Sequence, residues 1–249
     1  MLRHLLRALF FAHTGTRNHA MTLPLFPDEW AKSGSDSASD SERETESLAD
    51  GAMILRGLAC SDQLLLWREL LHVISQAPLR RMVTPGGLPF SVDTTSCGQV
   101  GWISDRRGYR YVDRDPISGA EWPALPDSFL KLATVAAQRA GFPSFVPDSC
   151  LINRYQSGSK MSLHQDRDER DVAAPIVSVS LGLSAVFLFG GLTKADKVHR
   201  VRLYHGDVVV FGGPSRLRFH GILPLTLRDE NGHSLTGPYR INLTFRTAR

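Results

Sequence analysis

The chain has 249 residues, 42% of them hydrophobic, which suits one globular domain of roughly 200 residues with a tail. Its formal net charge of +4 is compatible with a polyanionic partner but does not require one. The cysteines, Cys60, Cys97 and Cys150, are odd in number and lack metal-type spacing, which indicates reduced thiols and a cytoplasmic protein. No apolar run approaches the roughly 20 residues of a membrane span, so we expect no membrane association.

The first part of the chain is predicted to lie outside the folded domain. Residues 1–20 are rich in Leu and Arg and lack acids, as in a transit peptide or a poor signal peptide, although translation beginning at Met21, or a loose tail, explains them better. Residues 32–50 are rich in Ser and acids and predict a disordered linker. We therefore expect residues 1–50 to be a disordered or transit-like extension, and a single domain to cover residues 51–249.

Two helices and one short strand are expected before residue 149. Residues 52–55 resemble a strand, and residues 61–77 have apolar side chains at a helical period. Ser61 or Asp62 can cap this helix, and Pro78 ends it. A second helix is predicted over residues 127–140, before Gly and Pro stop signals.

Residues 84–123 are expected to be irregular and allow two interpretations. Trp102, Tyr109, Tyr111 and Trp122 alternate with arginines, a mixture that suits base stacking and phosphate contact. The other interpretation is a long loop region with its own small core, which this pattern alone favours. The choice needs an independent signal from elsewhere in the chain.

From residue 149 onward the pattern changes to short strands rich in Val, Ile and Phe and separated by Gly. Strands are predicted over residues 150–156, 175–182, 185–190, 198–204, 207–211, 216–221 and 239–247. Strands that follow two helices predict an α+β fold, with a double-sheet jelly-roll barrel and the helices packed on one outer face.

One motif suggests a metal site. His164 and Asp166 are two residues apart on an extended segment, so their side chains point the same way. His220 is the best third ligand, because the other candidate histidines fall in a turn, on an exposed strand or in a polar loop: His205, His199 and His233. Two His and one carboxylate on one face of an iron leave the opposite positions open for a co-substrate and oxygen.

The last predicted strand alternates sharply between apolar and polar residues. Its polar face carries Arg240, Asn242, Thr244 and Arg246. Such a face usually lies in water. If it instead lines the barrel interior, the two arginines need anions, and a dicarboxylate such as 2-oxoglutarate supplies two. Asn153 and Tyr155, also two apart, would then add neutral donors.

Several stretches together resemble the AlkB family of iron- and 2-oxoglutarate-dependent dioxygenases, which repair alkylated nucleic acid. They are MVTPGG (82–87), CG–GW (97–102), LINRY (151–155), LHQDRDE (163–169), PIVSVSLGL (175–183), HGDVVVFGG (205–213), SRL–FHG (215–221) and YRINLTFR (239–246). The resemblance covers nearly all of residues 51–249 and implies a nucleotide-recognition lid over residues 82–122. It also implies oxidative removal of methyl groups of the N1-methyladenine and N3-methylcytosine type, as formaldehyde, while 2-oxoglutarate and O2 become succinate and CO2.

The resemblance also implies a role for individual residues. It implies that Fe(II) is bound by His164, Asp166 and His220, and that 2-oxoglutarate is bound by Asn153, Tyr155, Arg240, Asn242 and Arg246. Trp102 and His164 would sandwich the damaged base, Tyr109 would contact the backbone beside it, and Asp168 would face its exocyclic amine. Four positions depart from the family's bacterial founding member, which has a tryptophan in place of Phe211, a small residue and a methionine in place of Asp93 and Thr94, and an arginine in place of Lys194.

The expected partner is alkylated DNA, preferably single-stranded, with RNA as a second substrate, and the expected protein is a monomer. Two alternatives remain. A catalytically inactive nucleic-acid-binding barrel would have no need of the His-Asp-His set or of both arginines. An oxygenase of the same fold acting on a protein or small molecule would have no need of Trp102, Tyr109 and the arginine-rich segment 104–114.

Overall fold

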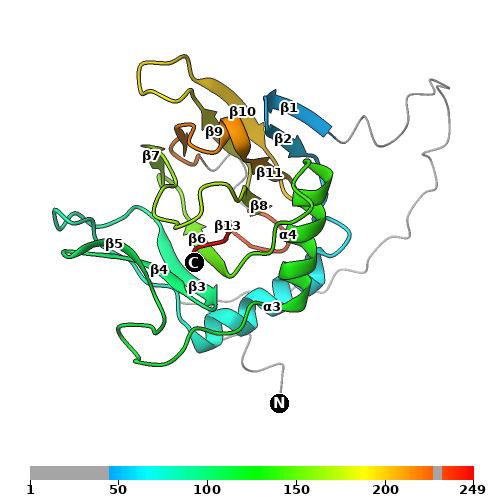
Figure 1. Cartoon of the computed structure of the whole chain (residues 1–249). Coiled ribbons are helices and arrows are strands. Elements are labelled where there is room, and N and C mark those ends of the chain that lie inside the picture. The colour runs from blue at the N-terminus through cyan, green and yellow to red at the C-terminus, as the bar shows by residue number, and fades with distance from the viewer. Residues whose placement is uncertain (1–44, 227–231) are drawn as a thin grey trace, which may run out of the picture. The chain divides into compact units, whose positions relative to one another are not determined.

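Two antiparallel sheets form the body of the molecule in the computed structural model, which describes residues 45–226 and 232–249 (Figure 1). The larger, seven-stranded sheet has the order β1-β2-β11-β8-β13-β6-β3, and the smaller, four-stranded sheet has the order β10-β9-β12-β7. The larger sheet consists of β1 (Thr45–Ala49), β2 (Ala52–Leu55), β3 (Asp93–Gly98), β6 (Ser149–Tyr155), β8 (Ile176–Gly182), β11 (Val208–Phe211) and β13 (Arg240–Arg246). The smaller consists of β7 (Met161–His164), β9 (Ala185–Phe189), β10 (His199–Leu203) and β12 (His220–Ile222). This is the predicted jelly-roll architecture.

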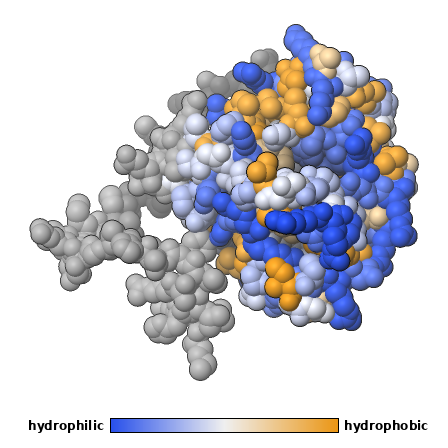
Figure 2. Space-filling model, turned by 90° about the vertical axis from the view of Figure 1, so that its left-hand side faces the viewer, coloured by the Kyte–Doolittle hydropathy of each residue, from blue (hydrophilic) through white to orange (hydrophobic). Residues whose placement is uncertain are grey.

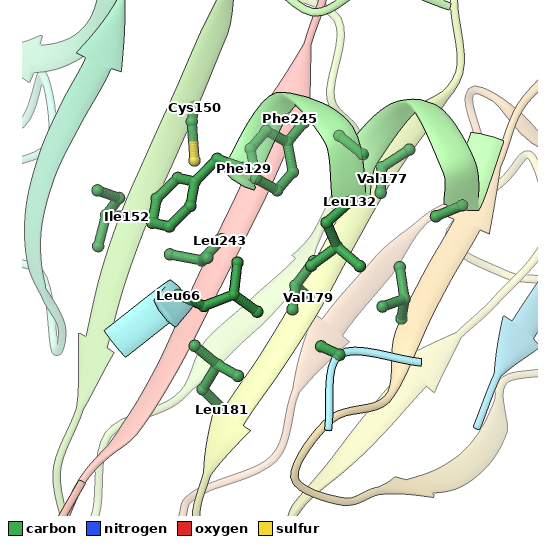
Figure 3. Close-up of a cluster of buried hydrophobic side chains, with 14 of the residues drawn as sticks. Leu66, Phe129, Leu132, Cys150, Ile152, Val177, Val179, Leu181, Leu243 and Phe245 are labelled. Atoms are coloured by element: carbon green, nitrogen blue, oxygen red, sulfur yellow. The ribbon is translucent and has the colours of Figure 1, made fainter. Parts of the chain in front are cut away.

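The helices cover the outer face of the larger sheet. They are α3 (Gln63–Gln76) and α4 (Asp127–Arg139). Their apolar side chains, such as Leu66 and Phe129, join Ile152, Val179 and Leu243 in one buried cluster (Figure 3). The predicted packing of the helices on one face is therefore confirmed. None of the described helices is long and apolar enough to cross a membrane.

A second buried cluster lies between the two sheets. It joins Ile54 and Val209 of the larger sheet to Phe187 and Ile222 of the smaller one. The alternation along β13 follows from these two layers. Ile241, Leu243 and Phe245 belong to the cluster under the helices, so the polar residues between them point into the barrel.

All the residues of β13 are buried, polar ones included. The expectation of a polar face that lines the barrel interior is thereby confirmed, and the alternative of a face in water is wrong. Arg240 is 1% exposed and Arg246 is 6% exposed. Two buried guanidinium groups on one strand require partners, and those partners define the site described below.

The predicted strands after residue 149 match the structure closely, with one exception. Residues 216–221 were expected to form a strand, but only β12 (His220–Ile222) is extended, after a 3₁₀ turn over Gly213–Ser215. The reason is Arg216, which is 3% exposed and turns its side chain inward to bond the backbone of two other segments. A continuous strand would not leave that side chain free to reach them.

Two expectations for the first half of the chain need correction. Residues 84–123 are not irregular throughout, because their middle part contains β3, β4 (Gly101–Asp105) and β5 (Gly108–Val112). Order begins before Gly51, since β1 pairs with β2 and Glu46 bonds Arg56. The rest of the expected extension, residues 1–44, lies outside the described residues. The predicted helices differ from α3 and α4 by at most two residues at either end.

Candidate metal centre and its surroundings

The register of two short strands brings the candidate histidines together. His220 of β12 lies directly opposite His164 of β7 in the antiparallel ladder. Their ring centroids are 4.4 Å apart. Gly221 makes this possible, because a Cβ there would stand 2.5 Å from the carbonyl oxygen of Met161. Only glycine lets β12 come this close to β7.

Backbone carbonyls fix which nitrogen of each ring faces the centre. His164 Nδ1 donates to the carbonyl of Ser162 at 2.9 Å, and His220 Nδ1 donates to the carbonyl of Arg218 at 3.1 Å. A carbonyl only accepts, so in each neutral ring the proton is on Nδ1 and the lone pair is on Nε2. The two Nε2 atoms lie 3.5 Å and 3.8 Å from the carboxylate oxygens of Asp166. The three ligand atoms all lie within 4.8 Å of one another.

The charges around this group favour metal-binding protonation states for Asp166 and His220, whereas the pKa of His164 is raised, because burial lowers it but Asp166 raises it more. Burial alone would raise the pKa of Asp166, but Arg246 and His164 together hold it well below the ordinary value of 3.8. Burial, with His164 beside it, lowers the pKa of His220 to about 4. At neutral pH the set therefore offers an ionised carboxylate and a neutral imidazole, as a divalent metal requires. Phe211 packs against His220, with ring centroids 4.9 Å apart, and limits its movement.

A second carboxylate supports the centre from behind. Glu169 is 7% exposed and accepts hydrogen bonds from Arg216 Nη2 at 2.9 Å and from Tyr111 Oη at 2.6 Å. Arg246 lies 3.3 Å from Glu169 and donates to Asp166 at 2.7 Å. Sequence reasoning assigned no role to Glu169 or Arg216, and it named Tyr111 only among the aromatics that suit base stacking. Their contacts join residues 47 and 58 positions apart, so no local pattern could have shown them.

Arg240 provides a direct test of whether the barrel interior fits a carboxylate. Its Nη2 donates to Ser180 Oγ at 3.1 Å, whereas its Nε and Nη1 are buried without a partner in the described part of the chain. Burial lowers its pKa from the ordinary value of 12.5. A buried guanidinium without an anion is costly, and two of its nitrogens still have N–H groups to donate. The residues present therefore fit the carboxylate of a bound 2-oxoglutarate.

The other expected co-substrate residues lie on the same inner wall but differ in availability. Tyr155 lies under the guanidinium of Arg240, 5.7 Å from it, and burial raises its pKa to about 12, so its phenol stays protonated. Asn242 already uses its amide group, because Nδ2 donates to Ser178 Oγ and to the Val179 carbonyl. Asn153 pairs with Asn242 across β6 and β13. Only its Oδ1 has a partner among the described residues.

The expected substrate residues meet at the edge of the metal loop. Trp102 Nε1 donates to Asp168 Oδ2 at 2.9 Å, and Asp168 follows Asp166 by two residues. The Trp102 ring stacks with Tyr109, centroids 5.7 Å apart, and with Phe90 at 6.1 Å. Tyr109 is 48% exposed. A cleft of about 350 Å³ includes Tyr109 and Asp168 in its lining, so aromatic and acidic groups share one opening.

Figure 2 turns the left-hand side of Figure 1, where β4, β5 and β7 lie, toward the viewer. Hydrophilic areas dominate this face, and separate hydrophobic patches interrupt them.

Comparison with known proteins decides the family. Residues 51–246 match the model of the 2OG-Fe(II) oxygenase superfamily. The chain is 54% identical to the "Alpha-ketoglutarate-dependent dioxygenase AlkB" of Salmonella typhimurium over 203 residues, 82% of this chain and 93% of that protein. The chain belongs to the AlkB family. The Escherichia coli protein of the same name is also 54% identical, over 84% of this chain and 95% of its own length.

Membership of the AlkB family extends to the fold. A solved structure, "The structure of OsALKBH1", superposes with a TM-score of 0.71 at 31% identity and covers 82% of this chain and 99% of that one. The AlkB-type metal set, His164, Asp166 and His220, is gathered in one place here. The lid expected over residues 82–122 and the roles of the individual site residues stay predictions.

Proposed function

We propose that this protein is an Fe(II)- and 2-oxoglutarate-dependent dioxygenase that removes methyl groups from alkylated bases of DNA. The observation that carries the proposal is the contact between the Trp102 indole and Asp168 beside the metal set. A ring face and a carboxylate next to an oxidising centre suit a cationic planar substrate. Adenine methylated at N1 and cytosine methylated at N3 are such cations.

His164, Asp166 and His220 would hold Fe(II), and Arg240 would bind one carboxylate of 2-oxoglutarate. When bound, the metal, the co-substrate and O2 together supply the oxidation that converts the N-methyl group to a hydroxymethyl group, which leaves as formaldehyde. The protein's own residues hold the ligand atoms of the metal site in place. Arg246 keeps Asp166 ionised, and the Ser162 and Arg218 carbonyls keep both Nε2 atoms turned inward.

The depth of the site determines how a base reaches it. Asp166 and His220 are each 8% exposed, so a base still stacked in a duplex does not reach them. The base must be extruded, which costs least for a lesion that no longer pairs or for a single strand. We therefore propose single-stranded DNA as the preferred substrate and RNA as a second one.

We further propose a lid over residues 82–122. We also propose that the enzyme is monomeric and cytoplasmic, with three free thiols: Cys60, Cys97 and Cys150.

Formaldehyde release tests this proposal. The purified protein is incubated with single-stranded oligonucleotides that carry N1-methyladenine or N3-methylcytosine, and with unmethylated oligonucleotides of the same sequence. We expect formaldehyde only from the methylated strands, and only with both Fe(II) and 2-oxoglutarate present. Oligonucleotide binding without formaldehyde would indicate an inactive binding module. Succinate production unaffected by any oligonucleotide would indicate a protein or small-molecule substrate.

A further inference from the structure

Thr94 has a fixed position on the inner wall of the barrel. It lies on β3, is fully buried, and pairs with Asn153 of β6. The edge of β3 is closed by Arg80, which both donates to and accepts from the Thr94 backbone, at 3.0 Å and 2.7 Å. A β-branched side chain on a backbone held from both sides has little rotational freedom. The Thr94 hydroxyl therefore points in one defined direction.

That hydroxyl holds one end of the Asn153 amide. Thr94 Oγ1 donates to Asn153 Oδ1 at 2.9 Å. With Oδ1 held there, the Nδ2 group, which has two protons, turns the other way. Within residues 45–226 and 232–249, Asn153 Nδ2 makes no hydrogen bond, and it is not fully buried. It therefore faces accessible space inside the barrel.

The contrast with Asn242 shows why Thr94 matters. Asn242 lies opposite Asn153, but Ser178, Val179 and Thr244 engage both ends of its amide. Its orientation is therefore fixed and its donors are used. Asn153 depends on Thr94 alone among the described residues, and it keeps its donors free.

We propose that Thr94 is a positioning residue for 2-oxoglutarate: it holds Asn153 Oδ1 so that Nδ2 is presented as a donor to a carboxylate of the co-substrate. The inference rests on the proposed function. An amide turned the other way would set Oδ1 against that carboxylate and repel it. An apolar side chain at this position would donate no hydrogen bond to Asn153 Oδ1. The device therefore depends on the Thr94 hydroxyl.

The test compares three variants by titrating 2-oxoglutarate into Mn(II)-loaded protein in a calorimeter, which measures binding without turnover. Thr94→Val removes the donor at nearly constant volume, and Thr94→Ser restores it. The matched control is Thr95→Val on the same strand. Thr95 is 1% exposed and donates to the Ala77 carbonyl at 2.8 Å, away from the barrel interior. Both valine variants lose one buried hydrogen bond, so we expect similar falls in Tm.

We expect Thr94→Val to raise the Kd of 2-oxoglutarate by about threefold to tenfold, the range for one neutral hydrogen bond, with Mn(II) affinity unchanged. Thr94→Ser and Thr95→Val should bind like the wild type. Unchanged affinity in Thr94→Val, equal weakening in Thr95→Val, or a failure of Thr94→Ser to restore binding would each overturn the inference. A wild-type protein that binds no 2-oxoglutarate would overturn the proposed function itself.

Discussion

Replacing Arg240 with methionine should make the ligand-free protein more stable. Arg240 is 1% exposed, and its Nε and Nη1 have no partner among the described residues. Replacing buried ions with apolar side chains of similar volume commonly stabilises proteins by about 1–4 kcal/mol. We expect an increase of that order in the free energy of unfolding, and about 2–4 °C in Tm for each kcal/mol. Thermal unfolding of the apo protein measures it.

The same substitution should abolish 2-oxoglutarate binding. Two charge-assisted hydrogen bonds contribute roughly 1.5–3 kcal/mol each, so their loss weakens binding by about 10²-fold to 10⁴-fold. Melting Mn(II)-loaded protein with and without 2-oxoglutarate shows both effects. The wild type should gain Tm with the co-substrate, and Arg240→Met should start from a higher Tm and gain nothing.

Arg246→Met is the matched control. Arg246 is also buried, which by itself would lower its pKa, but Asp166 and Glu169 pair with it and raise that pKa well above its ordinary value. Removing it leaves the buried Asp166 carboxylate without its arginine partner, while Glu169 keeps Arg216, and breaking such a buried pair costs about 3–5 kcal/mol. A higher Tm in Arg240→Met and a lower Tm in Arg246→Met, both measured on the apo protein, would support the account. If Arg240→Met destabilises the apo protein as Arg246→Met does, or still binds 2-oxoglutarate, the assignment of Arg240 is wrong.

Three further predictions follow from single contacts. Burial, with His233 beside it, lowers the pKa of His205 below 6.5, and the neutral ring accepts a hydrogen bond from the Gly182 N–H. As the pH falls, His205 is therefore protonated in the unfolded chain before it is protonated in the folded protein. The free energy of unfolding should therefore fall as pH drops below 6.5, and fall less in His205→Gln, as denaturant melts across pH would show. Tyr111→Phe loses only the bond to Glu169 and should raise KM for methylated oligonucleotide about tenfold while 2-oxoglutarate affinity stays constant. Trp102→Ala should lower kcat/KM about tenfold to hundredfold and spare succinate formation without nucleic acid.

Each of these predictions has a contradicting result. An identical pH profile in His205→Gln would show that other groups set the acid sensitivity. A weakened 2-oxoglutarate affinity in Tyr111→Phe would mean that the bond to Glu169 supports the metal centre rather than the hairpin of β4 and β5, which carries Trp102 and Tyr109. A parallel fall of both reactions in Trp102→Ala, with the loss of about 3–5 kcal/mol expected for a core aromatic, would exclude the stacking role.

The parts of the site that the sequence predicted well carry strong local patterns. His164 and Asp166 share one short motif, and the alternation along residues 240–246 separates the core face from the inner face. Both patterns depend on side-chain periodicity within one strand, which is visible without knowing the neighbours. His220 required the choice of one histidine among several, and the β7/β12 register explains that choice.

The missed parts depend on partners far away in the chain. β3 (Asp93–Gly98) is polar yet largely buried, because Thr94 bonds Asn153 on the inner face and Thr95 bonds the Ala77 carbonyl on the other face, so it has no hydrophobic alternation to detect. β1 is a largely exposed edge strand within a Ser- and acid-rich segment. Glu169 and Arg216 look like surface charges until the fold buries them together. Tertiary contacts, not local pattern, determine these elements.

The most direct test of the central claim is the stoichiometry of the reaction. Formaldehyde and succinate are measured in one reaction with a single-stranded oligonucleotide containing N3-methylcytosine, for the wild type and for Asp166→Asn, which keeps the shape of the side chain but loses its charge. The account predicts that the wild type forms formaldehyde and succinate in equimolar amounts once the succinate formed without oligonucleotide is subtracted, and that the variant forms neither product above background. Formaldehyde without succinate, or wild-type turnover in Asp166→Asn, would contradict it.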